Sequence, residues 1–395
     1  MSKFNMRDLM KKDGTRTILA SLLSIIIGML AGSVIITIVG LTNETLGVKG
    51  VWDGIRIVCL GLFVKGRDAA GELVFTFNPQ MMGNMLFRAI PVIMTGLSVA
   101  VANKTGLFNI GAAGQYTLGA FGALYCAIVL QLPWYLCLLA AMVLGALWGA
   151  IPGIFKAYLN INEVITAIMF NWIGLYMVND IMYGKGQSPM YDLATTKTYS
   201  LRKVAKGSMI PSYGLSDHFG KLQSVTIAIF IAVFFAIIVY IVLNKTTFGY
   251  ELKACGFNKN AAQYAGINDK RNIILSMTIA GALAGVGAGL YYLSTVAEWN
   301  PQVSTALPAL GFNGISAALL ACSNPIGTIF SSLFISYITV GGTKLSTQYY
   351  TKEIADVITA LIIYLCAFSM LFRSKIRALL AGKTRHMNVG KGGNG

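Results

Sequence analysis

The sequence consists largely of apolar runs that are long enough to cross a lipid bilayer. A transmembrane helix needs about 20 mainly apolar residues, and ten runs of 16 to 24 residues approach or reach this length. The runs are Ile18–Leu41, Met81–Ala102, Ala112–Leu130, Trp134–Phe155, Val164–Tyr183, Val225–Leu243, Ile273–Leu293, Thr305–Cys322, Ile326–Gly341 and Ile354–Phe372. They predict an all-α, polytopic transmembrane helix bundle with about ten spans. The eighth and ninth are short and contain Gly and Pro, so either of them is a candidate for a broken or re-entrant helix.

Composition excludes the main alternatives. Of the 395 residues 55% are hydrophobic and only 12% are charged, whereas soluble domains carry roughly 25% charged residues. A disordered chain needs low hydrophobicity, so that class is excluded too. The net charge of +16 comes from basic residues in short segments between the apolar runs. We therefore expect these segments to contact anionic membrane lipid, and we expect no nucleic acid partner.

Basic residues also predict the orientation. With the N-terminus inside, the inner segments hold 18 Lys and Arg and the outer segments hold 12. Short loops count most in this rule, and long outer loops are translocated largely regardless of charge. An even number of spans then places both termini in the cytoplasm. The predicted parts are an N-terminal tail over 1–17, a membrane domain over 18–372 and a basic C-terminal tail over 373–395.

Two connections are long. The outer loop 184–224 is polar, and the inner loop 244–272 contains short helical stretches between Gly249, Gly256 and Gly266. Glycines at such positions are typical of helix ends. A structured helix in an inner loop predicts a contact surface for a cytoplasmic partner.

Side chains of unusual polarity lie among the spans. They are the amides of Asn109, Gln115, Asn171 and Asn313. An amide inside a bundle often faces a water-filled path, but it can equally form hydrogen bonds between helices, and both interpretations stay open. Carboxylates are scarce in the spans, which disfavours a carrier driven by an ion gradient.

Glycines at helical spacing, such as Gly119, Gly281 and Gly285, predict helix backbones in close contact. The six cysteines form no CxxC pair and the two histidines stand alone, so we expect no metal site. No nucleophile–base pair and no complete P-loop is visible. The sequence therefore predicts a chain that is not an enzyme.

Four stretches occur in an order that is informative. They are Lys104–Gln115 (KTGLFNIGAAGQ), Asn162–Asn171 (NEVITAIMFN), Gly256–Asn268 (GFNKNAAQYAGIN) with the following span to Gly285, and Gly311–Leu320 (GFNGISAALL) with Asn324–Gly327. Together they resemble elements of the permease subunits of bacterial binding-protein-dependent ABC importers. The resemblance is to the nucleoside and simple-sugar branch, which is related to ribose and branched-chain amino acid permeases. Ala113 and Asn313 stand where that pattern has carboxylates, and Phe170 stands where it has Leu.

The resemblance implies a set of partners in a bacterial plasma membrane. An extracytoplasmic substrate-binding lipoprotein would deliver a nucleoside or simple sugar to a path formed with a second permease subunit, which is the same or a homologous chain. Cytoplasmic ABC ATPases would dock on the inner loop and bind ATP and Mg, so this chain would carry no cofactor. The resemblance places Phe108, Asn109, Gln115, Asn171 and Asn313 on the substrate path. It assigns ATPase coupling to Glu163, Glu251, Ala261, Ala262, Gly266 and Asn268.

Two alternatives come from other classes. One is a secondary transporter that moves a small polar solute by means of an ion gradient. The other is a membrane scaffold that transports nothing, which the amides within the spans disfavour.

Overall fold

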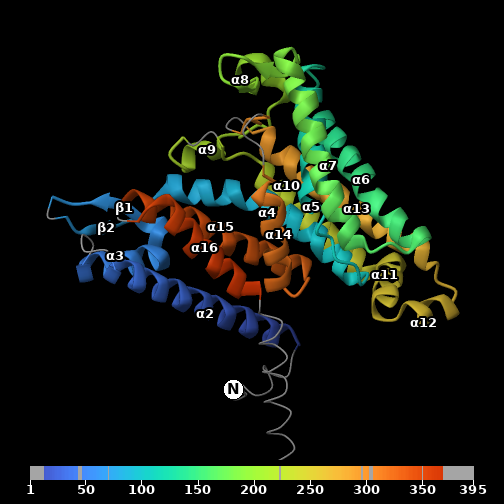
Figure 1. Ribbon diagram of the computed structural model, residues 1–395, viewed down its shortest axis with the longest axis horizontal. Coiled ribbons are helices and arrows are strands. Elements are labelled where there is room, and N and C mark those ends of the chain that lie inside the picture. Colours follow the sequence, from blue (N-terminus) through green and yellow to red (C-terminus); the bar gives the residue numbers. More distant parts are fainter. Residues whose placement is uncertain are drawn as a thin grey trace, which may run out of the picture. The chain divides into compact units, whose positions relative to one another are not determined.

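The computed structural model describes residues 13–42, 47–69, 71–221, 224–294, 297–301, 306–348 and 350–367 (Figure 1). The predicted C-terminal tail 373–395 and residues 1–12 of the predicted N-terminal tail lie outside the described residues. The chain is mostly helical, as the sequence predicts. The elements in order are α2 (Asp13–Thr42), α3 (Gly47–Leu60), η1 (Gly61–Phe63), β1 (Val64–Arg67), β2 (Leu73–Phe75), α4 (Pro79–Lys104), α5 (Ala112–Ile128), α6 (Trp134–Leu159), α7 (Glu163–Tyr183), η2 (Gly184–Gly186), β3 (Tyr191–Asp192), β4 (Lys197–Thr198), α8 (Leu201–Val204), η3 (Lys206–Ser208), α9 (Leu215–His218), α10 (Ala228–Lys245), α11 (Thr247–Phe257), α12 (Lys259–Tyr264), α13 (Asp269–Tyr292), α14 (Ala309–Leu320), α15 (Pro325–Gln348) and α16 (Lys352–Ala367).

Each of the ten predicted runs contains a helix, but the helices differ in length from the runs. Seven are long and apolar enough to cross a membrane, namely α2, α4, α6, α7, α10, α13 and α15. The other three, α5, α14 and α16, have 17, 12 and 16 residues. The helix in the eighth run, α14, is short, as expected. The helix in the ninth run, α15, is longer than the run itself, because it continues to Gln348.

The chain divides into two compact units. The described residues up to Gly61, 319–322 and from Gly341 onward form the smaller unit, and the others form the larger one. In the smaller unit α2 packs against both α3 and α16. The Tyr350 hydroxyl lies 3.4 Å from the carbonyl oxygen of Ile36 on α2 and 3.5 Å from that of Gly50 on α3. It therefore joins the segment before α16 to both α2 and α3.

Helix α3 and the strands are features that the sequence analysis does not predict. The buried residues of α3 include Val51, Gly54, Ile57 and Val58, which lie on one face at helical spacing. At 14 residues the helix is too short to count as a span. Strands β1 and β2 form an antiparallel hairpin in which Val64 is opposite Phe75, and β3 pairs with β4 in a second one.

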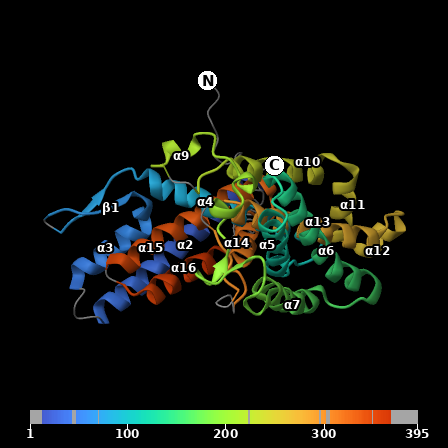
Figure 2. The same cartoon turned by 90° about the horizontal axis from the view of Figure 1, so that it is seen from above.

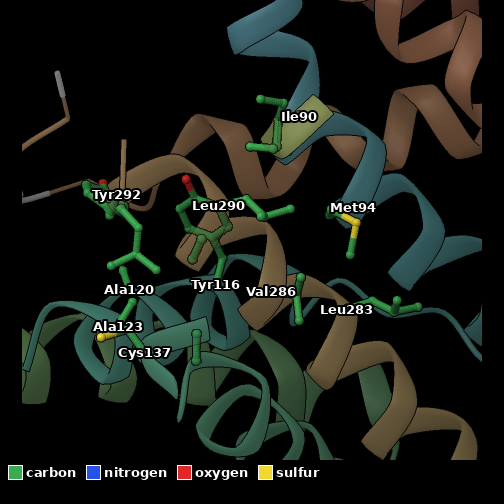
Figure 3. Packing of buried hydrophobic residues seen from close by; sticks show 14 of the residues in the cluster. Ile90, Met94, Tyr116, Ala120, Ala123, Cys137, Leu283, Val286, Leu290 and Tyr292 are labelled. Atoms are coloured by element: carbon green, nitrogen blue, oxygen red, sulfur yellow. The ribbon is translucent and has the colours of Figure 1, made fainter. Parts of the chain in front are cut away.

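In the larger unit α4 and α13 are central. Their apolar windows are 83% and 72% buried, against 28% for α6 and for α10 and 33% for α7. Helices α4, α5, α6 and α13 share one hydrophobic core (Figure 3). The residues labelled in Figure 3 are Ile90 and Met94 from α4, Tyr116, Ala120 and Ala123 from α5, Cys137 from α6, and Leu283, Val286, Leu290 and Tyr292 from α13. The less buried helices have apolar outward faces, which suit contact with lipid.

The backbones of α5, α6 and α13 meet at Gly285. A methyl group added there would lie 2.2 Å from the carbonyl oxygen of Ala141 on α6. A methyl at Gly119 on α5 would lie 2.3 Å from the Cα of Gly285, and one at Gly145 on α6 would lie 2.4 Å from the carbonyl oxygen of Gly281. The close packing predicted for these glycines is confirmed.

The loops of the larger unit gather into two sets. In one set, Asn103 Nδ2 donates to Ser323 Oγ over 3.1 Å and the Lys270 ammonium lies 5.2 Å from the centre of the Tyr158 ring. In the other set, the N–H of Ile210 donates to the carbonyl oxygen of Leu293 over 3.1 Å. The first pair of contacts joins segments that the sequence predicts as inner loops, and the second contact joins segments that it predicts as outer loops. The loop that carries α11 and α12 packs against α13, and α11 also contacts α4; helices α10, α11, α12 and α13 lie near one another in Figure 2.

Substitution of Gly285 by Ala tests the contact between the three backbones. The methyl group has no space, and overpacking of this kind costs typically about 1–3 kcal/mol. We expect a lower melting temperature for the detergent-solubilised chain, measured by size-exclusion after heating. Gly207→Ala is the control, because a methyl there meets nothing within 4 Å. Equal melting temperatures for the two variants would contradict the close contact of the three backbones at Gly285.

Candidate functional site

The connection between α4 and α5 turns back into the bundle. The N–H groups of Thr105 and Leu107 both donate to the carbonyl oxygen of Ala102, over 3.0 Å each, and Gly106 has the φ of +76° that the turn needs. Asn109 then lies beside Ser98, a residue of α4. Helix α5 therefore begins inside the bundle, at Ala112.

Asn109 and Gln115 hold this irregular segment by a reciprocal pair of hydrogen bonds. Asn109 Nδ2 donates to Gln115 Oε1 over 2.8 Å, and Gln115 Nε2 donates to Asn109 Oδ1 over 3.1 Å. Asn109 Nδ2 also donates to Ser98 Oγ over 2.9 Å. Both amides are buried. Since each is bonded to protein, neither carries the cost of an unpaired polar group in the interior.

Asn171 caps α5 from another helix. Its Oδ1 accepts from the N–H of Gly114 over 2.7 Å, and its Nδ2 donates to the carbonyl oxygen of Ile110 over 3.0 Å. The residue at the N-cap of α5 is Gly111, which has no side chain to perform this task. A methyl group at Gly114 would lie 2.8 Å from the Cα of Asn171, so glycine permits the approach.

Asn109, Gln115 and Asn171 are thus brought together, as an amide cluster, around the first turn of α5. All three use their hydrogen-bonding groups on protein partners. Of the two interpretations left open by the sequence, hydrogen bonding within the bundle describes this arrangement.

Phe108 and Asn313 differ from the amide cluster. Both side chains are partly exposed. Asn313 forms no hydrogen bond with any residue that the structure describes. It lies on α14 two residues after Gly311, where an added methyl would be 2.5 Å from the Cα of Ala113. The first turns of α5 and α14 therefore touch. Asn313 is the one predicted path amide that forms no hydrogen bond with a described residue.

The inner loop forms two short helices, as predicted, and a side chain caps the N-terminus of each. Thr246 Oγ1 accepts from the N–H of Gly249, and Asn258 Oδ1 accepts from the N–H of Ala261. Asn268 Oδ1 caps the start of α13 by accepting from the N–H of Arg271 over 3.0 Å. Such caps satisfy backbone donors that a helix start leaves free. The loop is a folded segment with a definite surface.

The residues predicted to act in coupling are placed differently from one another. Ala261, Gly266 and Asn268 are exposed, whereas Ala262 is buried. Glu251 is half-buried and accepts from Asn272 Nδ2 over 3.2 Å.

Glu163, the first residue of α7, pairs with Lys156 on α6 over 2.9 Å. Two aromatic residues of the inner loop that are not among the predicted site residues, Phe257 and Tyr264, are 95% and 94% exposed. Their position at the ends of α11 and α12 is the signal that could have identified them.

No group of three or more His, Cys, Asp or Glu side chains in the described part of the chain is arranged to hold a metal ion. The chemical resources of the site are amides, hydroxyls, backbone groups and aromatic rings. Such groups bind a polar solute by hydrogen bonds and stacking.

Comparison with known proteins identifies the family. The family model described as "branched-chain amino acid transport system / permease component" matches residues 81–367. The nucleoside ABC transporter permease protein NupB of Lactococcus lactis subsp. cremoris is 33% identical over 386 residues, which are 96% of this chain and 98% of that protein. The guanosine ABC transporter permease protein NupP of Bacillus subtilis is 32% identical over 361 residues, 90% of this chain and 94% of that protein. The glucose ABC transporter permease protein TsgB13 of Haloferax volcanii is 29% identical over 331 residues, 81% and 84% of the two chains.

The family match covers most of the membrane domain, and the two nucleoside-related proteins match nearly the whole chain. The relatives are ABC transporter permeases, and seven helices are long and apolar enough to cross a bilayer, so the chain is a multi-pass integral membrane protein, of the plasma membrane in bacteria. The chain belongs to the family of branched-chain amino acid transport system permease components, and it is a transport subunit.

Proposed function

We propose that this permease forms the path by which a nucleoside enters the cell, as one membrane subunit of an ABC importer. The observation that carries the proposal is near full-length similarity to two permeases whose names specify nucleosides or guanosine. A simple sugar is the second candidate, because the glucose permease matches 81% of this chain. ATP hydrolysis would occur in cytoplasmic ATPase subunits. A substrate-binding lipoprotein and a second permease chain would complete the importer.

Within the path we assign two roles. Asn109, Gln115 and Asn171 hold the first turn of α5 in the wall, since their amides are bonded to protein. Phe108 and Asn313 meet the solute, because both are partly exposed. An aromatic face suits a nucleobase, and an amide suits ribose hydroxyls or a base edge. The first turns of α5 and α14 support this, because helix N-termini inside a membrane attract electron-rich groups.

Coupling would use the surface of α11 and α12 at the end that we assign to the cytoplasm. Ala261, Gly266 and Asn268 face outward there, with Phe257 and Tyr264 beside them. Glu251 and Ala262 would hold this surface from behind, and the Glu163–Lys156 ion pair would fix the neighbouring α6–α7 turn.

The central test is uptake into proteoliposomes that contain the purified complex, with guanosine and glucose offered separately. We expect ATP-dependent guanosine uptake that requires the binding protein. Uptake by this chain alone, driven by an ion gradient, would overturn the proposal. ATP-dependent uptake of glucose but not of guanosine would assign the sugar instead.

Asn171→Leu and Asn313→Leu form a matched pair. The first removes a cap and leaves the N–H of Gly114 and the carbonyl of Ile110 unpaired, at about 1–3 kcal/mol for each buried group. We expect it to lower both the melting temperature and the uptake. The second removes an amide with no described protein partner, so we expect it to reduce uptake by about tenfold, equivalent to ~1.4 kcal/mol, at an unchanged melting temperature. Wild-type uptake by Asn313→Leu would remove Asn313 from the path.

Ala261→Arg tests the coupling surface without disturbing the fold, since Ala261 is exposed whereas Ala262 is buried. A bulky charge in a packed interface should reduce co-purification of the ATPase by about tenfold or more. Leu193→Arg is the control, because Leu193 is 71% exposed in the loop at the other end of the unit. Loss of the ATPase from both variants, or from neither, would refute the assignment.

A further inference from the structure

An apolar recess lies in the larger unit where α10 packs beside the central helices. It has a volume of about 200 Å³, and all thirteen residues that line it are apolar. Helix α10 contributes Val239 and Leu243, and α13 contributes Ala282 and Val286. A water molecule or a nucleoside needs polar partners, and this lining offers none. The recess suits a hydrocarbon chain.

The recess is closed at one end by the corner between α10 and α11. Val242 lines it before the corner, and Phe248 and Leu252 line it after the corner. The corner is tight, because a methyl group at Gly249 would lie 2.1 Å from the carbonyl oxygen of Val242. Along the lining, Met142, Ile238 and Ala282 remain partly exposed, so the recess opens to the surroundings of the unit. In a membrane protein, those surroundings are acyl chains.

Two ammonium groups stand beside the closed end. Lys245 is the last residue of α10 and is exposed, and Lys253 follows the lining residue Leu252. Lys253 Nζ lies 3.5 Å from Asn244 Oδ1, which places it against the end of α10. Neither lysine pairs with a carboxylate among the described residues. An apolar slot and two uncompensated positive charges therefore adjoin one another.

We propose that this recess binds one acyl chain of an anionic phospholipid, whose phosphate lies against Lys245 and Lys253. The two halves of the site match the two halves of such a lipid, and basic pockets between membrane helices are known to bind acidic headgroups. The bound chain would lie between α10, α11 and α13 and brace the α10–α11 corner. The proposal rests on contacts within the larger unit and is independent of which solute is transported.

Native mass spectrometry of the full-length chain tests the proposal, with phosphatidylglycerol and phosphatidylcholine of identical acyl chains. We expect one phosphatidylglycerol to be retained after extensive detergent washing. Ala282→Phe fills the recess and should reduce its retention by about fivefold or more, whereas Ile241→Phe on the exposed side of α10 should not. The double variant Lys245→Gln, Lys253→Gln should lose the preference for phosphatidylglycerol, whereas Lys185→Gln at the other end of the unit should keep it.

The melting temperature of each variant tests whether it is folded. Lys245 is exposed and Lys253 is partly exposed, so their substitution remains informative even if Ala282→Phe does not fold. A second readout is crosslinking by a phosphatidylglycerol with a photoreactive acyl chain, mapped to peptides of α10, α11 and α13. Equal retention of the two lipids by the wild type would overturn the proposal. So would unchanged phosphatidylglycerol binding by folded Ala282→Phe.

Discussion

The larger unit depends on a contact between three helix backbones. In a bilayer, apolar side chains gain little by leaving lipid for protein, so association relies on close packing and hydrogen bonds. Gly285 of α13 supplies the close packing, because the backbones of α5 and α6 both approach it closely. This contact fixes the separation of α5, α6 and α13; α4 and α7 pack against this group, and α10 packs mainly against α4. Polar groups can then be placed inside the unit at defined positions.

The amide cluster is the second layer of this organisation. A chain segment that turns back inside a bundle exposes backbone groups that lipid cannot satisfy. Asn109, Gln115 and Asn171 supply the missing partners from the segment itself, from α5 and from α7. Hydrogen bonds that stabilise the fold thereby also shape the region that we propose as the solute path. Asn313 forms no hydrogen bond with a described residue, and it is the amide that we assign to solute contact.

Much of this fold is predictable from the sequence, because span length and glycine spacing are local properties. A helix occurs in each of the ten runs, and the inner loop forms two short helices as expected, although Gly249 and Gly256 lie inside the ends of α11 and only α12 lies between two of the expected glycines. The start of α5 inside the bundle is not predictable, because it depends on Asn171, 57 positions away from Gly114. Helix α3 is not predicted from the sequence, because it is short and of mixed polarity. Residue type alone also cannot tell that Ala261 faces outward and Ala262 inward, since that depends on how α12 rests on its neighbours.

The cap that Asn171 places on α5 has a consequence for any cycle of opening and closing. If α7 slid along α5, the N–H of Gly114 and the carbonyl of Ile110 would lose their partners together. Each such loss costs about 1–3 kcal/mol. The close contact between Gly114 and the backbone of Asn171 also leaves no space for a sideways shift. We therefore expect helices α5 and α7 to move together in such a cycle.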